Sequence, residues 1–436
     1  MVTVLILGGL AQDATQHLLP FLLSPSLHPA HRPSFVRIVD RALVIPAADA
    51  YTTYVDTACR AALKSGTEKG TVEYLQGNLL TEPMREKAFT LPDAHGGASK
   101  GFDWVFDFTG ETDFNAPEVV HIERTLRLAL LLGQSAVKHK AGAYVRALPS
   151  FYRLAKDKKG KVGAEGETAA PWGVMSSWHH EAARGLATLE GLNLVFVRPA
   201  LLYGPFTVMG ITPRALIGEV YKFQNEKLEF LWSESLPHNT VHAHDYASAL
   251  VHSAAWALSL GSRAAVLAAR SEALPSTLSS DAQVAALGSL GAATSKDEVR
   301  AAVFNAADDG ETTQKDIAKL IAEVIGVKSG FHGSVISSFA KLNIGEVVED
   351  VNDKHLEGWS DLLQASNPPI LTNMPISPAV PADLLGPHPI SFDNGALKRL
   401  TGWTPRYRLT ADVLRETVEG FRREGNWPNA KPKGKK

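Results

Sequence analysis

The stretch "VTVLILGGLAQDATQHLLPFLL" (residues 2–23) decides the fold that we expect for this chain. It opens with a continuous apolar run, which is typical of a strand buried on both faces of a parallel sheet. Two glycines follow, and the segment from residue 13 onward has the apolar spacing of a helix. The apolar run is too short to span a membrane and has no basic leader, so it indicates a buried strand.

The same alternation of strand and helix patterns continues along the chain. It predicts an α/β fold with a doubly wound parallel sheet. The clearest helix pattern covers residues 118–139, and an Ala-, Ser- and Leu-rich segment at 265–296 predicts a poorly ordered, flexible loop or a weak helix. The further strand-like runs are residues 35–40, 71–78, 102–110, 142–148 and 193–199.

Composition excludes several classes of protein. Of the 436 residues, 45% are hydrophobic and 21% are charged, which is an ordinary globular balance. A formal net charge of −2 argues against a protein that binds nucleic acid or anionic membranes. The single cysteine, Cys59, allows no intramolecular disulfide and favours a reducing compartment, so we expect a cytoplasmic protein.

The run "VRPALLYGPF" (Val197 to Phe206) carries a resemblance to a known family. Together with residues 2–14, the acidic end of "FVRIVD", "NTVHAHDYASAL" and two segments nearer the C-terminus, it resembles the extended short-chain dehydrogenase/reductase family, also called NAD-dependent epimerase/dehydratase. The resemblance implies a Rossmann dinucleotide-binding domain over residues 1–206. It also implies a smaller C-terminal α/β substrate domain over 207–436, from which some segments return to the first domain.

The glycine loop departs from the family pattern. Glycines between the first strand and helix permit a tight turn and a close approach of backbone to a pyrophosphate at the helix N-terminus. Gly8 holds the first position of the family's GxxGxxG, whereas Ala11 and Ala14 replace the other two glycines. Gly9 adds freedom to the turn, and Asp13 near the helix start would repel a phosphate.

Asp40 ends the second strand-like run, where a carboxylate would accept hydrogen bonds from ribose hydroxyls and repel a 2′-phosphate. This favours NAD, although the adjacent Arg41 leaves NADP open. The alternative is that Asp40 only caps the following segment. By the resemblance, the remaining candidate cofactor contacts are Asn78 for the adenine, the loop residues Phe108, Thr109 and Gly110, and Pro199.

The stretch "PWGVMSSWHHEAARGL" (residues 171–186) stands where the resemblance implies a catalytic YxxxK helix. In the family the Tyr exchanges a proton while the Lys lowers its pKa and holds the nicotinamide ribose. One alignment places Gly173 and Ser177 at these positions, and another places Trp172 and Ser176 there. Neither alignment retains a phenol or an ammonium group.

Three residues are candidate replacements for the missing acid–base group, and a fourth is a candidate for orienting the substrate. Tyr152 is the first residue of an earlier YxxxK sequence, "YRLAK". Because Lys156 belongs to a charged loop, we interpret this spacing as a coincidence. Ser150 is the candidate substrate-orienting hydroxyl. His179 and His180 lie on the predicted helix and titrate near neutral pH, but adjacent helical residues face about 100° apart, so at most one reaches the site.

Two functions remain open. The first is an NAD(P)-binding oxidoreductase, epimerase or dehydratase acting on an unknown, sugar-nucleotide-like substrate, with Arg198 and Tyr203 on the substrate side. The second is a catalytically degenerate nucleotide-binding or scaffold protein. The resemblance also implies a homodimer through residues 118–136 and 175–189, where Trp178 would anchor the contact. We expect no metal site, because the histidines of "HNTVHAHD" match a metal-free segment of the family.

Overall fold

The computed structural model describes residues 1–46, 53–154, 169–294, 297–370 and 374–434. Contacts divide the chain into two compact units, whose segments alternate along the sequence. Unit 1 comprises Met1–Pro199, His244–Ala307 and Phe392–Thr404, and unit 2 comprises Ala200–Ala243, Asp308–Ser391 and Pro405–Lys436.

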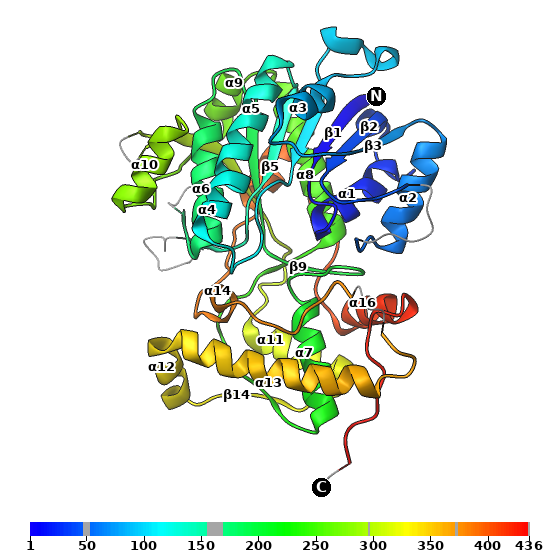
Figure 1. Cartoon of the computed structure of the whole chain (residues 1–436), viewed down its shortest axis with the longest axis vertical. Helices are drawn as coiled ribbons and strands as arrows, with labels where there is room; N and C mark the ends of the chain where they lie inside the picture. The colour runs from blue at the N-terminus through cyan, green and yellow to red at the C-terminus, as the bar shows by residue number, and fades with distance from the viewer. Residues whose placement is uncertain (47–52, 155–168, 295–296, 371–373, 435–436) are drawn as a thin grey trace. The chain divides into compact units, whose positions relative to one another are not determined.

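Unit 1 is built on a sheet that has eight strands within the described residues, in the order β12-β13-β8-β5-β4-β1-β2-β3 (Figure 1). All neighbours pair in parallel except β12, which runs antiparallel to β13 at the edge. This confirms the predicted doubly wound parallel sheet. The strands are β1 (Val2–Leu7), β2 (Pro33–Asp40), β3 (Val72–Gln76), β4 (Trp104–Asp107), β5 (Ala143–Ala147), β8 (Leu194–Pro199), β12 (Glu272–Ala273) and β13 (Arg300–Ala306).

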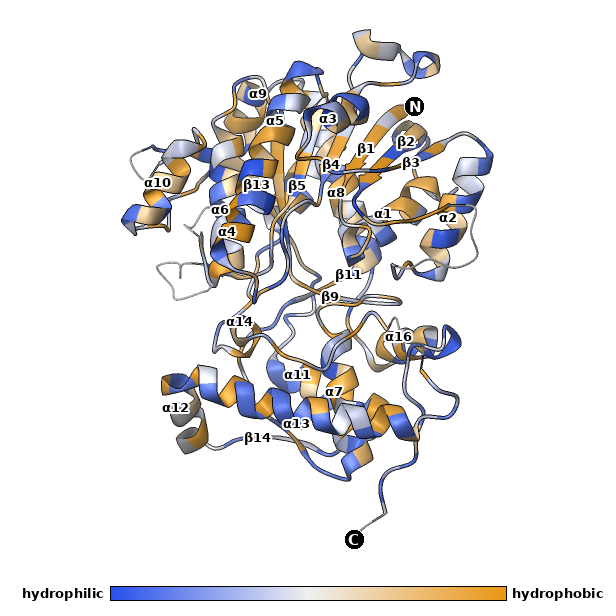
Figure 2. Cartoon of the chain, viewed as in Figure 1, coloured by the Kyte–Doolittle hydropathy of each residue, from blue (hydrophilic) through white to orange (hydrophobic). Residues whose placement is uncertain are grey.

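The strands are apolar because helices cover both faces of the sheet, and Figure 2 shows their hydrophobic residues gathered inside unit 1. The predicted helix at 118–139 is one continuous helix with a π-helical section, η4, in its middle. The helices of unit 1 are α1 (Asp13–Leu23), α2 (Thr57–Glu68), α3 (Glu82–Phe89), α4 (Glu118–His121), η4 (Ile122–Arg127), α5 (Leu128–Lys138), α6 (Val174–Ala187), α8 (Ala243–Leu260) and α15 (Gly395–Thr401).

Two shorter parts of unit 1 bear on the site. β6 (Tyr152–Leu154) pairs antiparallel with β7 (Ala169–Pro171) just before α6. The segment at 265–296, for which we expected a loop or a weak helix, contains most of α9 (Arg263–Ala269), the edge strand β12 and α10 (Asp281–Ser289). Its ordered elements differ from a loop because distant residues of α6 bind it, as described below.

Unit 2 has a small helical core in which Val220 and Phe223 pack against Leu362. None of the helices in the described parts of the chain has the length and apolar content that a membrane crossing requires. The elements of unit 2 are β9 (Leu201–Tyr203), α7 (Thr212–Gln224), β10 (Leu228–Phe230), β11 (Thr240–His242), α11 (Gln314–Ile325), β14 (Ser329–Phe331), α12 (Ser334–Leu342), α13 (Ile344–Ala365), α14 (Ala382–Leu385) and α16 (Ala411–Arg423).

Candidate functional site

The turn between β1 and α1 needs both of its glycines. Gly8 and Gly9 have φ values of +71° and +78°, a region that residues with a side chain rarely adopt. A Cβ atom on Gly9 would lie 2.7 Å from Cβ of Phe108, and one on Gly8 would lie 3.1 Å from Cγ2 of Thr109. The glycines therefore let the turn pass directly against the loop that follows β4.

The start of α1 is open to an anion. Ala11 is exposed, and Gln12, the N-cap residue, makes no side-chain cap hydrogen bond. Instead its Nε2 donates to Oγ1 of Thr112, 3.0 Å away, which ties the turn to the loop after β4. The positive end of the helix dipole thus has no side-chain cap from Gln12, whereas the buried carboxylate of Asp13 lies in the first turn and would oppose a bound phosphate.

Asp40 lies at the carboxyl end of β2 and faces this turn. Its Oδ2 accepts a hydrogen bond from the amide of Leu10 at 3.0 Å, and its Oδ1 accepts one from the amide of Ala42 at 2.9 Å. The carboxylate therefore caps the segment that follows β2, as in the alternative given above for Asp40. Each oxygen can still accept a second hydrogen bond, so a ribose hydroxyl is also compatible with this position.

The other residues predicted near the adenosine are less enclosed. Arg41 is exposed, and its charge helps to lower the pKa of Glu111, which puts the two side chains within electrostatic reach. Asn78 is exposed as well, and its Oδ1 accepts a hydrogen bond from the amide of Leu80. The amide NH₂ group of Asn78 is therefore the end that a ligand would meet.

The loop after β4 rests on a buried ion pair that sequence reasoning missed. Arg146 on β5 is fully buried and forms an ion pair with Asp107. Asp107 also accepts hydrogen bonds from Tyr144 and from the backbone and hydroxyl of Thr109. Arg146 in turn donates to the carbonyl oxygen of Thr109 at 2.9 Å. All the hydrogen bonds that Asp107 makes here therefore serve to shape the loop.

A second carboxylate of this loop, Glu111, also has structural partners. It pairs with Arg124 at 2.9 Å and accepts hydrogen bonds from the amides of Thr112 and Asp113. Although burial opposes the effect, these partners hold the pKa of Glu111 below its usual value. Glu111 is therefore ionised at neutral pH and holds the loop in shape.

His179 packs directly against this loop. A Cβ atom on Gly110 would lie 2.4 Å from Cε1 of His179, so the imidazole occupies the space beside that glycine. Nε2 of His179 lies 3.0 Å from the carbonyl oxygen of Glu111 and must be the donor, while Nδ1 has no partner among the described residues. Burial, helped by the charge of Arg146, lowers the pKa of His179 to about 3. The ring is neutral near pH 7.

Tyr152 and His180 belong to a second buried group. Their rings lie 5.7 Å apart, and the guanidinium of Arg198 lies 4.2 Å from the centre of the Tyr152 ring. Arg198 is fully buried and bonds to Asn305 and Glu272. Burial raises the pKa of Tyr152 and lowers that of His180 to about 4, so both are neutral at pH 7.

The structure distinguishes the two alignments of the absent Tyr–Lys pair. Gly173, just before α6, has φ +79° and ψ 158°, a combination that essentially only glycine adopts. A tyrosine in that position would be strained, which favours the alignment of Trp172 and Ser176 with the pair. Ser176 is buried, and its Oγ has no hydrogen-bond partner among the described residues.

The remaining predicted residues lie elsewhere. Ser150 lies between β5 and β6, Pro199 ends β8, and Tyr203 is buried in unit 2 with its ring 5.2 Å from that of His242. Lys156 lies outside the described residues. The described residues contain no group of three metal-binding side chains.

Trp178 differs from our expectation of an interface anchor. Its side chain is fully buried within the chain, and its Nε1 donates to Glu118 at 3.0 Å. It cannot anchor a contact with a second subunit, because the indole already packs inside unit 1.

Arg214, in the first turn of α7, was also missed from the sequence. Among the described residues, its guanidinium has a hydrogen-bond partner only in Nδ1 of His238, 3.3 Å away, and burial lowers its pKa to about 10. A cation at a helix N-terminus is electrostatically unfavourable by itself, so an anionic ligand would stabilise it. The "TPR" at the start of a helical pattern was the only sequence signal.

The chain has the fold of several solved enzymes at low sequence identity. A double mutant of dTDP-glucose 4,6-dehydratase from Streptomyces venezuelae with NAD bound is 15% identical, with 97% of each chain covered and a TM-score of 0.55. UDP-glucuronic acid 4-epimerase from Bacillus cereus, in complex with UDP-glucuronic acid and NAD, is 12% identical over 97% of this chain and 99% of that one, with a TM-score of 0.54.

UDP-glucose 4-epimerase from Thermotoga maritima with UDP-glucose is 14% identical over 97% of this chain and 99% of that one, with a TM-score of 0.53. No family model matches the chain, and no curated protein matches its sequence. The likeness to these structures confirms the epimerase/dehydratase fold that the sequence resemblance implied.

Proposed function

We propose that unit 1 binds NAD at the carboxyl edge of its parallel sheet. The main observation in support of this proposal is the geometry of the glycine turn. Asp40, at the end of β2, accepts a hydrogen bond from the amide of Leu10 in this turn. Ligands of open α/β sheets bind outside the carboxyl ends of the strands, where the strand order reverses, and here that place is between β1 and β4. NAD in several solved enzymes of this fold supports the same choice.

The residues present are compatible with a dinucleotide. Gly8 and Gly9 keep side chains out of the turn, and the uncapped start of α1 would face the pyrophosphate. Asp40 would accept ribose hydroxyls, while the loop of Phe108–Gly110 would border the nicotinamide half. When bound, NAD supplies a hydride acceptor.

The proposed activity is oxidation, epimerisation or dehydration of a sugar-nucleotide-like substrate. The UDP and dTDP sugars handled by proteins of this fold support this substrate class. Unit 2 would bind the substrate, and the cation of Arg214 suits an anionic group such as a diphosphate. A cytoplasmic setting agrees with the single buried cysteine, Cys59.

His179 is the acid–base candidate that the geometry favours. His179 contacts the loop after β4 directly, through Gly110 and the carbonyl oxygen of Glu111. Its unpartnered Nδ1 carries the lone pair that would receive a proton. A pKa of about 3 makes this a weak base at neutral pH, so we expect slow turnover.

A second candidate function is nucleotide binding without turnover. It is favoured by the burial of Tyr152, His179 and His180, whose pKa values all lie far from neutrality. Binding would then serve regulation or assembly.

One experiment separates the two functions. The purified chain with NAD is incubated with UDP-glucose, UDP-glucuronic acid or dTDP-glucose, and products are followed by NADH absorbance and by NMR of the sugar. Slow conversion that His179→Asn abolishes supports the enzyme. Binding of NAD with no conversion supports the second function. Rapid conversion that survives substitution of both histidines and Tyr152 would contradict our account of α6.

A further inference from the structure

From Trp178 to its end, helix α6 has no free face. All ten residues from Trp178 to Ala187 are buried, and at 3.6 residues per turn this run covers every direction around the helix axis. A helix on the outside of a sheet normally exposes a polar stripe. Here the sheet and the helix formed by α4, η4 and α5 cover part of α6, and another part of the chain must cover the rest.

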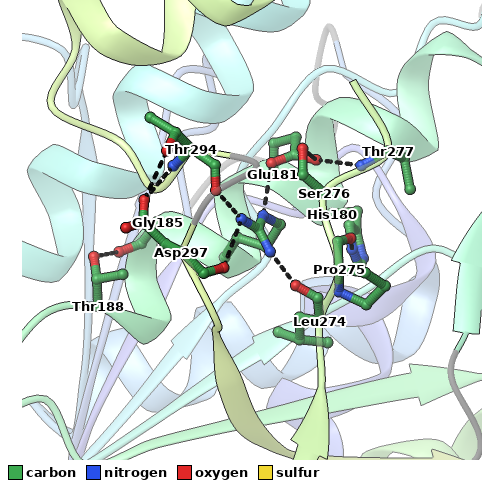
Figure 3. A network of polar contacts seen from close by, with 11 residues as sticks. His180, Glu181, Gly185, Thr188, Leu274, Pro275, Ser276, Thr277, Thr294 and Asp297 are labelled. Carbon is green, nitrogen blue, oxygen red and sulfur yellow. Dashed lines mark hydrogen bonds and ion pairs between the residues drawn. The ribbon is translucent and has the colours of Figure 1, made fainter. Parts of the chain in front are cut away.

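The covering segment is residues 274–294, and its two ends, Leu274 and Thr294 (Figure 3), both bond to one buried side chain of α6. Arg184 is fully buried and donates to the carbonyl oxygens of Leu274 and Thr294, while its Nε pairs with Glu181 at 2.9 Å. Thr294 is fixed in turn by Asp297, whose Oδ2 accepts its amide at 2.7 Å and its hydroxyl at 3.0 Å.

The first turn of the segment is fixed by two further residues of α6. Glu181 accepts hydrogen bonds from the hydroxyl of Ser276 and the amide of Thr277, both at 3.0 Å. His180 donates from Nε2 to the carbonyl oxygen of Pro275 at 2.8 Å (Figure 3). Burial raises the pKa of Glu181, against the effect of these donors, and such desolvation agrees with a contact closed to water.

The rest of the segment follows α6 toward α4. A Cβ atom built on Gly185 would lie 3.8 Å from Cβ of Ala292. From α10, Gln283 donates to Glu118 at 2.7 Å, the same carboxylate oxygen that accepts from Trp178. The segment therefore contacts α6 at two successive turns, residues 180–181 and 184–185, and contacts α4 through Gln283.

The neighbouring helix offers little apolar surface for a subunit contact, because Val119 is its one exposed large hydrophobic side chain. Its exposed positions include Arg124, Arg127, Gln134 and Lys138. The cores of stable interfaces are depleted in charged residues and rich in aromatic ones. Neither helix of the homodimer that we expected from the sequence therefore presents a suitable face.

We propose that residues 274–294 form an intramolecular cap that occupies the face of α6 in place of a second subunit, so that the chain is a monomer. The cap is held by the desolvated Arg184 and Glu181, and a second copy could reach α6 only after those contacts had broken. The proposal does not depend on the chain binding NAD.

The first test is the mass of the unmodified full-length chain in solution. Sedimentation velocity over a micromolar concentration range should give a single species near the chain mass of 46.9 kDa. A dimer in that range would overturn the proposal. This measurement needs no variant, so it remains decisive if a substitution prevents folding.

The second test asks whether the cap is seated on α6 in solution. In the double variant Gly185→Cys/Ala292→Cys, the two cysteines should form a disulfide in the presence of oxidised glutathione. The Cβ atoms at these positions are 3.8 Å apart, which is about the distance found in disulfides. The new Cβ at position 185 requires only the end of Leu130 to shift. In the matched control, Gly185→Cys/Gly288→Cys, the second cysteine lies where an added Cβ meets no atom within 4 Å, so no bond should form.

The native Cys59 is buried and should stay reduced in both variants. Loss of two free thiols in the 185/292 variant alone, with a monomer mass retained, supports the cap. A folded 185/292 variant that keeps its thiols, or equal oxidation of both variants, would overturn it.

Discussion

At the scale of single residues, Asp40 determines which dinucleotide we expect to bind. Its two oxygens are held in place by the amides of Leu10 and Ala42, so the carboxylate cannot easily turn away from a ligand. A 2′-phosphate would meet this negative charge at close range. We predict that NAD binds at least about tenfold more tightly than NADP, a difference of about 1.4 kcal/mol.

Competition of NAD and NADP for one fluorescent NADH site would measure this preference. Asp40→Asn keeps the shape of the side chain but removes its charge. This variant should therefore reduce the ratio of the NAD affinity to the NADP affinity. Tighter binding of NADP to the unmodified chain would show that Arg41, and not Asp40, governs the choice.

Gly110 provides a second prediction at this scale. An alanine there would combine an unfavourable φ of +133° with a Cβ atom 2.4 Å from the His179 ring. We predict that Gly110→Ala lowers the free energy of unfolding by about 1–3 kcal/mol. Gly261→Ala is the control, because its φ of +72° is also strained but no atom lies within 4 Å. Urea denaturation of both variants would compare them, and equal losses would contradict the contact with His179.

At the scale of elements, six strands of the parallel sheet were predictable because each is a largely apolar local run, whereas β12 and β13 were not predicted. The covering of α6 was not, because Arg184 and Leu274 lie ninety positions apart and neither has a distinctive neighbourhood. The same reason explains Arg146, a charge inside an apolar run whose partner, Asp107, lies on another strand. Sequence patterns report local structure, whereas these buried pairs depend on tertiary packing.

Arg184 gives a prediction for α6 as an element. Removing one partner of a buried ion pair leaves an uncompensated charge and typically costs about 3–5 kcal/mol. Arg184→Met should therefore lower the free energy of unfolding by several kcal/mol in urea denaturation. Arg127→Ala removes a half-exposed pair with Glu123 and should cost at most about 1 kcal/mol. Similar losses in the two variants would contradict the burial of Arg184.

The start of α6 gives a prediction about activity. Restoring the pair as Trp172→Tyr/Ser176→Lys should not produce efficient NAD reduction, although acid–base help is commonly worth about 10²- to 10⁴-fold. The new lysine would enter a site where Ser176 is only 1% exposed, so burial should disfavour its charged form. NADH formation with UDP-glucose, compared with Trp172→Tyr alone, is the measurement. A strong gain in the double variant would contradict this expectation.

At the scale of the whole molecule, buried histidines make the fold sensitive to acid. His179 and His180 have folded pKa values of about 3 and about 4, below the ordinary 6.5, so the unfolded chain binds protons first as the pH falls. The stability that they contribute is fully present above about pH 6.5 and is lost progressively toward pH 3–4. His355 in unit 2 also has a pKa lowered by burial, to about 4, and therefore adds to the loss of stability in acid.

We therefore predict that the midpoint of thermal unfolding falls continuously between pH 7 and pH 5 at constant ionic strength. A tenfold difference in proton affinity between the folded and unfolded chain corresponds to about 1.4 kcal/mol, so the combined loss on further acidification is on the order of several kcal/mol. An unfolding midpoint that stays constant down to pH 5 would mean that these imidazoles reach water.

The most direct test of the central claim is a calorimetric titration of the chain with NAD, after any copurified nucleotide has been removed by mild denaturation and refolding. We predict saturable binding of one NAD per chain, weakened when Asp40 is replaced by alanine. The absence of binding at millimolar NAD by a chain that has regained its native circular dichroism would contradict the assignment of the glycine turn and Asp40 to a dinucleotide site.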